Sequence, residues 1–325
     1  MATFYTALAG LTVAGIMALA GSPARADTVL TSGNGNVSLG VESLGATGLY
    51  TGLALLGVGD AITPGCYCEG WGAGSTSGTG YSANDNGSAN VNLVSGSGAT
   101  SVVNISGTSL NVQQIYMAST KSGAMFVDYV TLTNTGASTL TDVRYSRATD
   151  WDIPPTEFNE FTTIQGWPAT MLSFSNNNGF LAPDPFVDYT NNCRIGGNIT
   201  SCADVTNKNF SNLGPTDQGS FFTFRFGDLA AGASSSFEIF YGADYTTAAT
   251  LTDLAAVGAE VYVLGNSNNG GSPCTGSNGN CGTFAFGFAG VGGSPLPPVN
   301  TPEPASLALL GVGVLGLAAL RRKAV

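Results

Sequence analysis

Short runs of β-branched and aromatic residues, separated by Gly, Asn, Asp, Ser and Pro, extend along most of the 325-residue chain. Runs of strand length bounded by turn residues are the pattern of antiparallel β-proteins. The clearest of them are residues 100–107, 110–118, 124–136, 141–149, 221–226, 234–243 and 283–290. The sequence therefore predicts a mainly β fold, an antiparallel β-sandwich with one or two short helices.

Local patterns make this prediction more specific. Residues 127–152, VDYVTLTNTGASTLTDVRYSRATDWD, alternate polar and apolar side chains on both sides of Asn134–Gly136. This pattern predicts a β-hairpin whose turn begins at Asn134. The glycine-rich residues 70–90 and residues 265–282 are predicted to be loops.

One segment has the periodicity of a helix. Residues 247–262 place Leu251, Leu254, Ala255 and Val261 on one face. A face of this kind has to be buried, so we expect the helix to pack against an edge or end of a sheet.

The composition excludes several classes of enzyme. The chain contains no histidine, which rules out Ser-His-Asp and Cys-His catalysis and every His-ligated metal centre. It has no G-x-S-x-G nucleophile motif and no G-x-x-x-x-G-K-[ST] phosphate loop. The formal net charge is −11, which is unfavourable for binding nucleic acid, so no nucleic-acid partner is expected. Carboxylates are the groups that remain for any catalysis, and we expect no enzyme activity.

The chain has an even number of cysteines, which in an exported protein indicates disulfides. They are Cys66, Cys68, Cys193, Cys202, Cys274 and Cys281. Closeness in sequence favours the pairs 193–202 and 274–281, which leaves 66 with 68, although the other pairings stay open. A zinc site is the competing interpretation, but the chain offers neither a histidine nor a C-x₂-C spacing.

The densest acidic segment is DWDIPPTEFNE, which contains Asp150, Asp152, Glu157 and Glu160 around Trp151. Two of these carboxylates can be interpreted as the acid and the base or nucleophile of a glycosidase, with Trp151 as a platform for a sugar ring. The plainer interpretation is a polar strand end and loop, with Trp151 packed on the core.

Calcium is a third interpretation of the same segment. Asp150 and Asp152 offer hard oxygen ligands, which Asn159 or main-chain carbonyls could complete. We expect this arrangement only if a turn redirects the two aspartates toward one another. The candidate ligand or calcium contacts are thus Asp150, Trp151, Asp152 and Glu157, and calcium is the only cofactor considered.

Two further groups of residues are weaker candidates. Asp184 and Asp188 lie in a second acidic stretch, which is interpreted as a solvated loop. Trp71, Trp151 and Trp167 would form a carbohydrate-binding face if they were exposed together. Large aromatic side chains are more often buried, and a buried Trp71 beside a disulfide-pinned turn is the favoured interpretation of CYCEGWG.

The first residues have the features of a secretory signal. An apolar run, ALAGLTVAGIMALAG, precedes SPARA, in which Ala24 and Ala26 form the A-x-A pattern that signal peptidase cleaves. We therefore predict a signal peptide over residues 1–26 and a mature chain that begins at Asp27. A basic residue usually precedes the apolar run, and here there is none.

The last residues combine three features. Pro302, Glu303 and Pro304 precede an apolar run over residues 305–320, and Arg321, Arg322 and Lys323 follow it. As a helix the apolar run would rise ~24 Å, somewhat less than the ~30 Å hydrocarbon core of a bilayer. The basic cluster would stay cytoplasmic and leave the main domain outside. We predict a membrane-inserted helix over 305–320, preceded by an exposed, non-helical Pro-Glu-Pro segment.

This tail resembles the PEP-CTERM sorting signal of Gram-negative bacteria. The resemblance implies that a membrane-embedded exosortase recognises the tail and removes it, so that the protein is released or transferred outward. Proteins with this signal are typical of bacteria that make biofilms or exopolysaccharide. The expected partners are exosortase, signal peptidase with the export machinery, the membrane before processing, and exopolysaccharide.

The predicted organisation is a signal peptide at 1–26, a β-rich exported domain at 27–290, a Gly/Pro linker at 291–301 and the sorting signal at 302–325. The expected location is the periplasmic side of the inner membrane for the precursor, then the cell surface or medium. The expected role is structural or adhesive in a biofilm or exopolysaccharide layer. A carboxylate-based glycan hydrolase and a calcium-dependent glycan-binding module are the alternatives.

Overall fold

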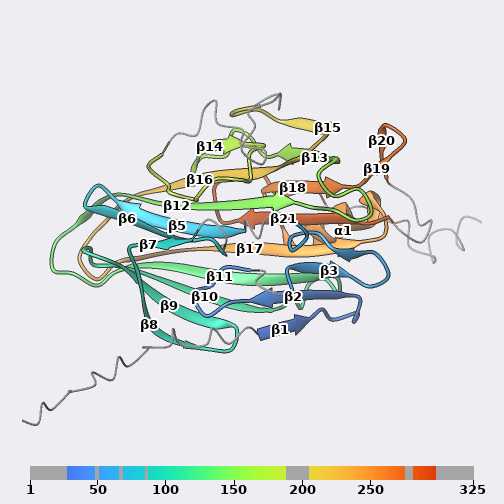
Figure 1. Ribbon diagram of the computed structural model, residues 1–325. Helices are drawn as coiled ribbons and strands as arrows, with labels where there is room; N and C mark the ends of the chain where they lie inside the picture. The colour runs from blue at the N-terminus through green and yellow to red at the C-terminus, as the bar shows by residue number, and fades with distance from the viewer. Residues whose placement is uncertain are drawn as a thin grey trace, which may run out of the picture.

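The computed structural model describes residues 28–47, 51–65, 69–84, 87–187, 205–274 and 281–297. In these ranges antiparallel strands dominate and one α-helix is present, so the predicted mainly β, antiparallel fold is confirmed (Figure 1). No helix in the same ranges has both the length and the apolar composition needed to span a bilayer. Several predicted features lie outside the described residues: the signal peptide, the sorting signal with its helix, Cys66, Cys68, Cys193, Cys202 and Asp188.

The largest sheet has nine strands in the order β15-β13-β18-β21-β17-β11-β10-β9-β8, each antiparallel to its neighbours. In chain order the strands are β8 (Val91–Ser97), β9 (Thr100–Ile105), β10 (Leu110–Ala118), β11 (Met125–Asn134), β13 (Glu160–Gln165), β15 (Phe210–Thr216), β17 (Ser234–Asp244), β18 (Val261–Asn266) and β21 (Thr283–Ala289). All seven strands that the sequence predicts are present in the structure, five of them in this sheet.

A second sheet has six strands in the order β14-β16-β12-β5-β6-β7. These strands are β5 (Gly70–Ser75), β6 (Gly78–Ser82), β7 (Ser88–Ala89), β12 (Leu140–Trp151), β14 (Leu172–Asn176) and β16 (Gln218–Leu229). A four-stranded sheet contains β1 (Thr28–Thr31), β2 (Val37–Val41), β3 (Leu53–Leu55) and β4 (Gly59–Asp60). A short pair, β19 (Asn268–Asn269) and β20 (Ser272–Pro273), lies in the segment predicted to be a loop over 265–282.

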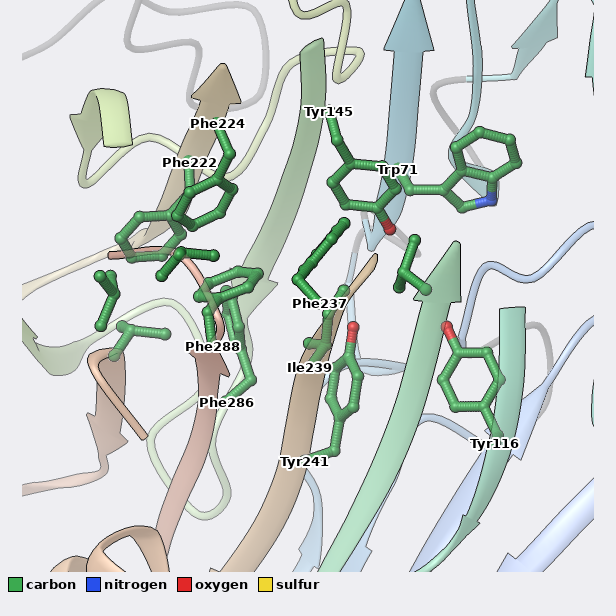
Figure 2. Packing of buried hydrophobic residues seen from close by; sticks show 14 of the residues in the cluster. Trp71, Tyr116, Tyr145, Phe222, Phe224, Phe237, Ile239, Tyr241, Phe286 and Phe288 are labelled. Carbon is green, nitrogen blue, oxygen red and sulfur yellow. The ribbon is translucent and has the colours of Figure 1, made fainter. Parts of the chain in front are cut away.

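The nine- and six-stranded sheets pack face to face through aromatic side chains. Phe222 and Phe224 of β16 contact Phe286 and Phe288 of β21 (Figure 2). The ring centroids of Phe224 and Phe288 are 4.6 Å apart, and those of Phe222 and Phe286 are 5.7 Å apart. All four rings are fully buried. Successive side chains of a strand point to opposite faces of its sheet, so Phe222 and Phe224 of β16, and likewise Phe286 and Phe288 of β21, enter the core between the sheets from one side of each strand.

A charged group also lies inside this core. Arg147 of β12 forms an ion pair with Glu69, with 2.5 Å between Nε and Oε1, and both side chains are fully buried. Arg147 also donates hydrogen bonds to the hydroxyls of Tyr116 and Tyr145, and the hydroxyl of Tyr241 donates to Glu69. Figure 2 shows the three tyrosine hydroxyls directed toward the same region of the core. The tyrosines come from β10, β12 and β17, so this polar cluster joins both sheets.

The predicted hairpin over residues 127–152 is wrong. Both of its strands exist, but β11 pairs with β10 and β17, whereas β12 pairs with β5 and β16. The connection between them passes from one sheet to the other. The buried Asn134 holds this crossing, because its side-chain amide donates to the carbonyl oxygens of Ser138, Leu229 and Ala230. A local alternating pattern predicts strands but does not determine which strands pair.

The predicted loop over residues 70–90 is also wrong, because β5 and β6 form a hairpin there. Its glycines allow close packing of neighbouring chain segments. A Cβ atom at Gly72 would collide with the carbonyl oxygen of Pro183, which lies against this strand. The glycine content indicated a loop. In the structure the glycines are part of strands, and their missing side chains let other segments of backbone pack closely against those strands.

The predicted helix over 247–262 is present but shorter. Helix α1 spans Thr247–Val257 and ends at Gly258, which has a φ of 85°. Glycine adopts this left-handed conformation readily, and the following residues enter β18. The helix packs on the outer face of the nine-stranded sheet rather than on an edge or end, with Leu254 and Val257 in a cluster with Phe240 of β17.

The chain after β21 stays close to the domain up to Leu296. The carboxylate of Glu260 accepts hydrogen bonds from the main-chain N–H groups of Val291 and Gly293, and the N–H of Leu296 donates to the carbonyl of Ala259. The first residues of the segment predicted as a linker are therefore packed against the sandwich.

Candidate functional site

Asp150 and Asp152 lie at the end of β12, where the chain leaves the six-stranded sheet. Asp150 is the second-last residue of the strand and is 1% exposed, and Asp152 directly follows the strand and is fully buried. The expected turn between them is not needed, because residues two apart on an extended segment point to the same side. The main-chain N–H of Asp152 donates to the carbonyl of Ala61 at 2.9 Å, which anchors the end of the strand.

Asp217 joins these two residues from a distant part of the sequence. It is the single residue between β15 and β16, where the chain passes from the nine-stranded to the six-stranded sheet. The register of β12 and β16 pairs Asp150 with Gly219 and Trp151 with Gln218, which places Asp217 beside the end of β12. One ligand oxygen from each of Asp150, Asp152 and Asp217 lies within 4.8 Å of the other two.

Glu160, at the start of β13, lies beside the same group. Its partner across the β13–β15 ladder is Thr216, the residue before Asp217. Its Oε1 atom accepts a hydrogen bond of 2.8 Å from the main-chain N–H of Gln218, which fixes the orientation of the carboxyl. We call Asp150, Asp152, Glu160 and Asp217 the carboxylate cluster.

The cluster is electrostatically unfavourable for several negative charges. Burial raises the pKa of Asp150 well above its usual value, and the neighbouring Asp152, Asp217 and Glu160 raise it further. Burial also raises the pKa of Glu160 to about 9, and the charges of Asp217 and Asp152 act in the same direction. The pKa of Asp217 is raised to about 6 by burial. Such a group of carboxylates either retains protons or binds a cation.

Two members of the predicted ligand set lie elsewhere. Glu157 belongs to the loop between β12 and β13 and is half-buried, and it is not among the carboxylates that converge. Trp151 is fully buried and packs on Phe286, with 5.9 Å between ring centroids. The prediction of Trp151 as a ligand contact or sugar platform is therefore wrong, because β12 directs its ring into the core between the sheets.

The predicted tryptophan face is not formed either. Trp71 is fully buried and stacks on Tyr145 at 6.1 Å, and Trp151 lies in the core, so only the half-buried Trp167 has exposed area. The favoured interpretation, in which Trp71 is buried, is confirmed. Asp184 lies in a loop, as predicted, and accepts hydrogen bonds from Thr79 Oγ1 and from the N–H of Phe186.

Of the predicted disulfides, the pair Cys274–Cys281 is present. It closes the segment that follows β20, close to the start of β21. The other four cysteines lie outside the described residues, so their pairing stays a prediction.

A shallow hollow of about 520 Å³ lies on the outer face of the nine-stranded sheet, over β11, β17 and β21. Tyr129 is 41% exposed there and stands opposite Glu238 across the β11–β17 ladder. Beside them, the hydroxyls of Thr131 and Ser236 are 3.0 Å apart. An exposed aromatic ring flanked by hydroxyls and a carboxylate has the donors, acceptors and flat apolar surface that a sugar ring can contact.

Sequence reasoning did not find Asp217 or the hollow. Asp217 occurs in the segment GPTDQG, whose composition is that of an ordinary turn. Its importance comes from strand pairing over more than 50 residues, which no local pattern reports. The hollow depends in the same way on the pairing of β11 with β17.

The comparisons with known proteins concern the tail and the fold separately. The family model described as the PEP-CTERM protein-sorting motif matches residues 300–323. A search of curated proteins gives no match. A solved structure from Escherichia coli K12, provisionally described as an aldose 1-epimerase, covers 84% of this chain and 94% of its own at 12% identity and a TM-score of 0.32. This likeness is too low to say anything about activity. The matched tail identifies the chain as the carrier of a PEP-CTERM protein-sorting motif, the signal of proteins exported by Gram-negative bacteria.

Proposed function

We propose that this protein is a structural or adhesive component of the extracellular layer of a Gram-negative bacterium, delivered there by exosortase processing. The observation that carries the proposal is the sorting motif at residues 300–323. It supports export through the inner membrane and processing at the Pro-Glu-Pro segment. The anionic composition, with a net charge of −11, suits a protein that has to remain soluble among other extracellular polymers.

The hollow on the nine-stranded sheet supports polysaccharide as the material that the protein contacts. Sugar-binding surfaces commonly combine an aromatic ring with hydroxyl and carboxylate groups that bond to sugar hydroxyls. Tyr129, Thr131, Ser236 and Glu238 provide these groups on one rigid pair of strands. Because the hollow is shallow, it suits weak contacts repeated along a polymer rather than the enclosure of a small ligand.

The test compares a deletion strain with strains that express the wild-type chain, Tyr129→Ala or the control variant Leu93→Ala. Leu93 is an exposed apolar residue on β8, away from the hollow. The deletion is expected to alter biofilm mass or cell aggregation, and Tyr129→Ala is expected to reduce retention of the protein in the polysaccharide layer at least several-fold. Unchanged biofilm after deletion would contradict the matrix role. Equal retention of Tyr129→Ala and Leu93→Ala would show that the hollow does not contribute to binding of the polysaccharide.

A carboxylate-based hydrolase is the alternative from another class, and the burial of the cluster counts against it. Glycosidases hold their two carboxyl groups about 5 to 9.5 Å apart in a cleft that admits the sugar chain. Asp150 and Asp152 are at most 1% exposed, and their oxygens lie within 4.8 Å of each other and of Asp217. We therefore expect the purified protein to release no reducing ends from the host polysaccharide, and steady release that is lost in Asp150→Asn would establish the hydrolase instead.

A further inference from the structure

The carboxylate cluster has no function in the proposed matrix role, yet it is built from two places where the chain passes between the sheets. The segment after β12 carries the chain toward β13, and Asp217 connects β15 to β16. Both crossings bring carboxylates to the same end of the sandwich. Acidic residues at a crossing would ordinarily point to solvent, because a buried charge is costly. Here Asp150, Asp152 and Glu160 are buried beside the half-buried Asp217, so the group either retains protons or binds a cation.

The protein itself provides no compensating partner for several of these oxygens. Oδ1 of Asp150 and Oε2 of Glu160 are buried and accept no hydrogen bond from the residues that the structure describes. Within the same residues, neither Asp150, Glu160 nor Asp217 forms an ion pair with a Lys or Arg. Asp150 is 1% exposed and Glu160 is fully buried, so bulk water does not solvate these two oxygens. Oxygens in this state are suited to direct coordination of a cation.

The spacing and the donor type select among cations. Two oxygens on opposite sides of Ca²⁺ are about 5 Å apart, since each lies 2.3–2.6 Å from the ion. The three aspartate oxygens, all within 4.8 Å of one another, can therefore bind one Ca²⁺ with little movement. Mg²⁺ requires shorter bonds and keeps several of its waters, which fits a buried site with three protein carboxylates less well. The all-oxygen donor set, in a chain without histidine, disfavours zinc.

We infer that Asp150, Asp152 and Asp217 form a calcium site at this end of the sandwich, with Glu160 beside it. The bound ion joins the end of β12 to the crossing between β15 and β16 and so connects the two sheets. Because the ion binds the folded chain and not the unfolded one, calcium stabilises the domain. The site does not depend on the matrix role or on the sorting route, and the purified protein is sufficient to test it.

The first experiment uses the wild-type protein purified from its own host and treated with chelator. Calcium chloride is added in steps from 10 µM to 5 mM while thermal unfolding is followed, and binding is measured by calorimetry. At 100 times the dissociation constant, a rise in Tm of about 5–10 °C is expected for a domain of this size. Magnesium chloride is expected to bind at least 10-fold more weakly. Equal Tm values with 5 mM calcium and with chelator, together with no heat of binding, would overturn the site.

The second experiment assigns the ligands. Asp150→Asn and Asp217→Asn are expected to weaken calcium binding at least 100-fold. Without calcium both should be as stable as the wild type or more stable, because each replaces a carboxyl of a crowded group with an amide that cannot ionise. The matched control is Glu157→Gln, an acid in the neighbouring loop that is not part of the cluster, and it should bind calcium like the wild type. Half-buried Asp217 keeps the test valid if Asp150→Asn does not fold. Wild-type affinity in Asp217→Asn, or loss of binding in Glu157→Gln, would contradict the assignment.

Discussion

At the scale of single residues, Arg147 connects the two sheets by charge as well as by packing. Its guanidinium contacts Glu69, Tyr116 and Tyr145, and no part of it is exposed to solvent. A buried ion pair contributes little relative to apolar residues of similar shape, but removal of one partner leaves the other charge buried and unpaired. The energetic importance of Arg147 therefore depends on the presence of Glu69.

We predict that Arg147→Met lowers the free energy of unfolding by about 3–5 kcal/mol, because Glu69 then remains buried without its partner. The double variant Arg147→Met with Glu69→Gln should recover part of this loss, since the uncompensated charge is removed. Urea unfolding of the two single variants and the double variant measures the coupling. If the loss in the double variant equals the sum of the losses in the two single variants, the ion pair is not the reason that Arg147→Met destabilises the protein.

Asp128 of β11 is a second buried charge in the core. Burial raises its pKa to about 7, and the charge of Glu69 acts in the same direction, whereas the charge of Arg147 and the hydrogen bond from the main chain of Ile115 oppose them. The main-chain N–H of Ile115 donates to Oδ1 of Asp128 at 3.0 Å. A carboxyl whose pKa is raised in the folded state is protonated more fully there than in the unfolded state. Its contribution to stability is therefore greatest below pH ~4 and is lost as the pH rises through about 7.

Asp128→Asn should remove this dependence on pH. Between pH 5 and pH 8 the variant is expected to gain about 3 kcal/mol of stability relative to the wild type, at 1.36 kcal/mol for each pKa unit. The amide oxygen of the new side chain can still accept the hydrogen bond from Ile115. Urea unfolding at the two pH values measures the difference, and a stability gap that does not change with pH would contradict the shifted pKa.

At the scale of elements, α1 shows how local signals position a helix. Thr246 is its N-cap, and its Oγ1 accepts a hydrogen bond of 3.1 Å from the N–H of Ala249. Gly258 ends the helix three residues before β18 begins. The apolar periodicity that was predicted to continue to residue 262 includes Val261, which is instead a buried residue of the next strand. Because Gly258 ends the helix, residues 261 and 262 belong to β18 and not to α1.

Thr246→Ala is expected to destabilise the domain by about 1 kcal/mol, because one main-chain N–H at the start of the helix loses its acceptor. Thr246→Ser keeps the hydroxyl, so it should lower the stability by only a few tenths of a kcal/mol. Thermal unfolding of the two variants side by side is the measurement. Equal losses in the serine and alanine variants would indicate packing of the threonine methyl group rather than capping.

At the scale of the whole molecule, processing and disulfide formation leave a signature in the mass of the mature protein. We predict a product that begins at Asp27, ends near Pro302–Pro304 and is lighter by six hydrogens than the reduced chain, which corresponds to three disulfides. Intact mass spectrometry of protein from the host envelope and medium measures all three features together. A mass that includes Ala305–Val325 would show that the tail is retained as an anchor.

Much of the architecture could be predicted from the sequence because strand formation is a local property. Alternation and β-branched residues indicated β9, β10, β11 and β12, and turn residues indicated where they end. The assignment of β11 and β12 to different sheets could not be predicted in this way, because pairing is decided by contacts between segments far apart in the chain.

For the candidate site, too, local features could be predicted from the sequence, whereas contacts between distant segments could not. From residue type and local spacing, the sequence determined the sorting tail and the absence of histidine chemistry, favoured the pair Cys274–Cys281, and named Asp150 and Asp152 as candidate ligands. Only the tertiary structure decided that Asp217 and Glu160 join them while Glu157 and Trp151 do not. The physical reason is that burial and proximity, which raise the pKa values of these carboxyls and bring the three aspartate oxygens together, arise from the register of β12 with β16 and of β13 with β15.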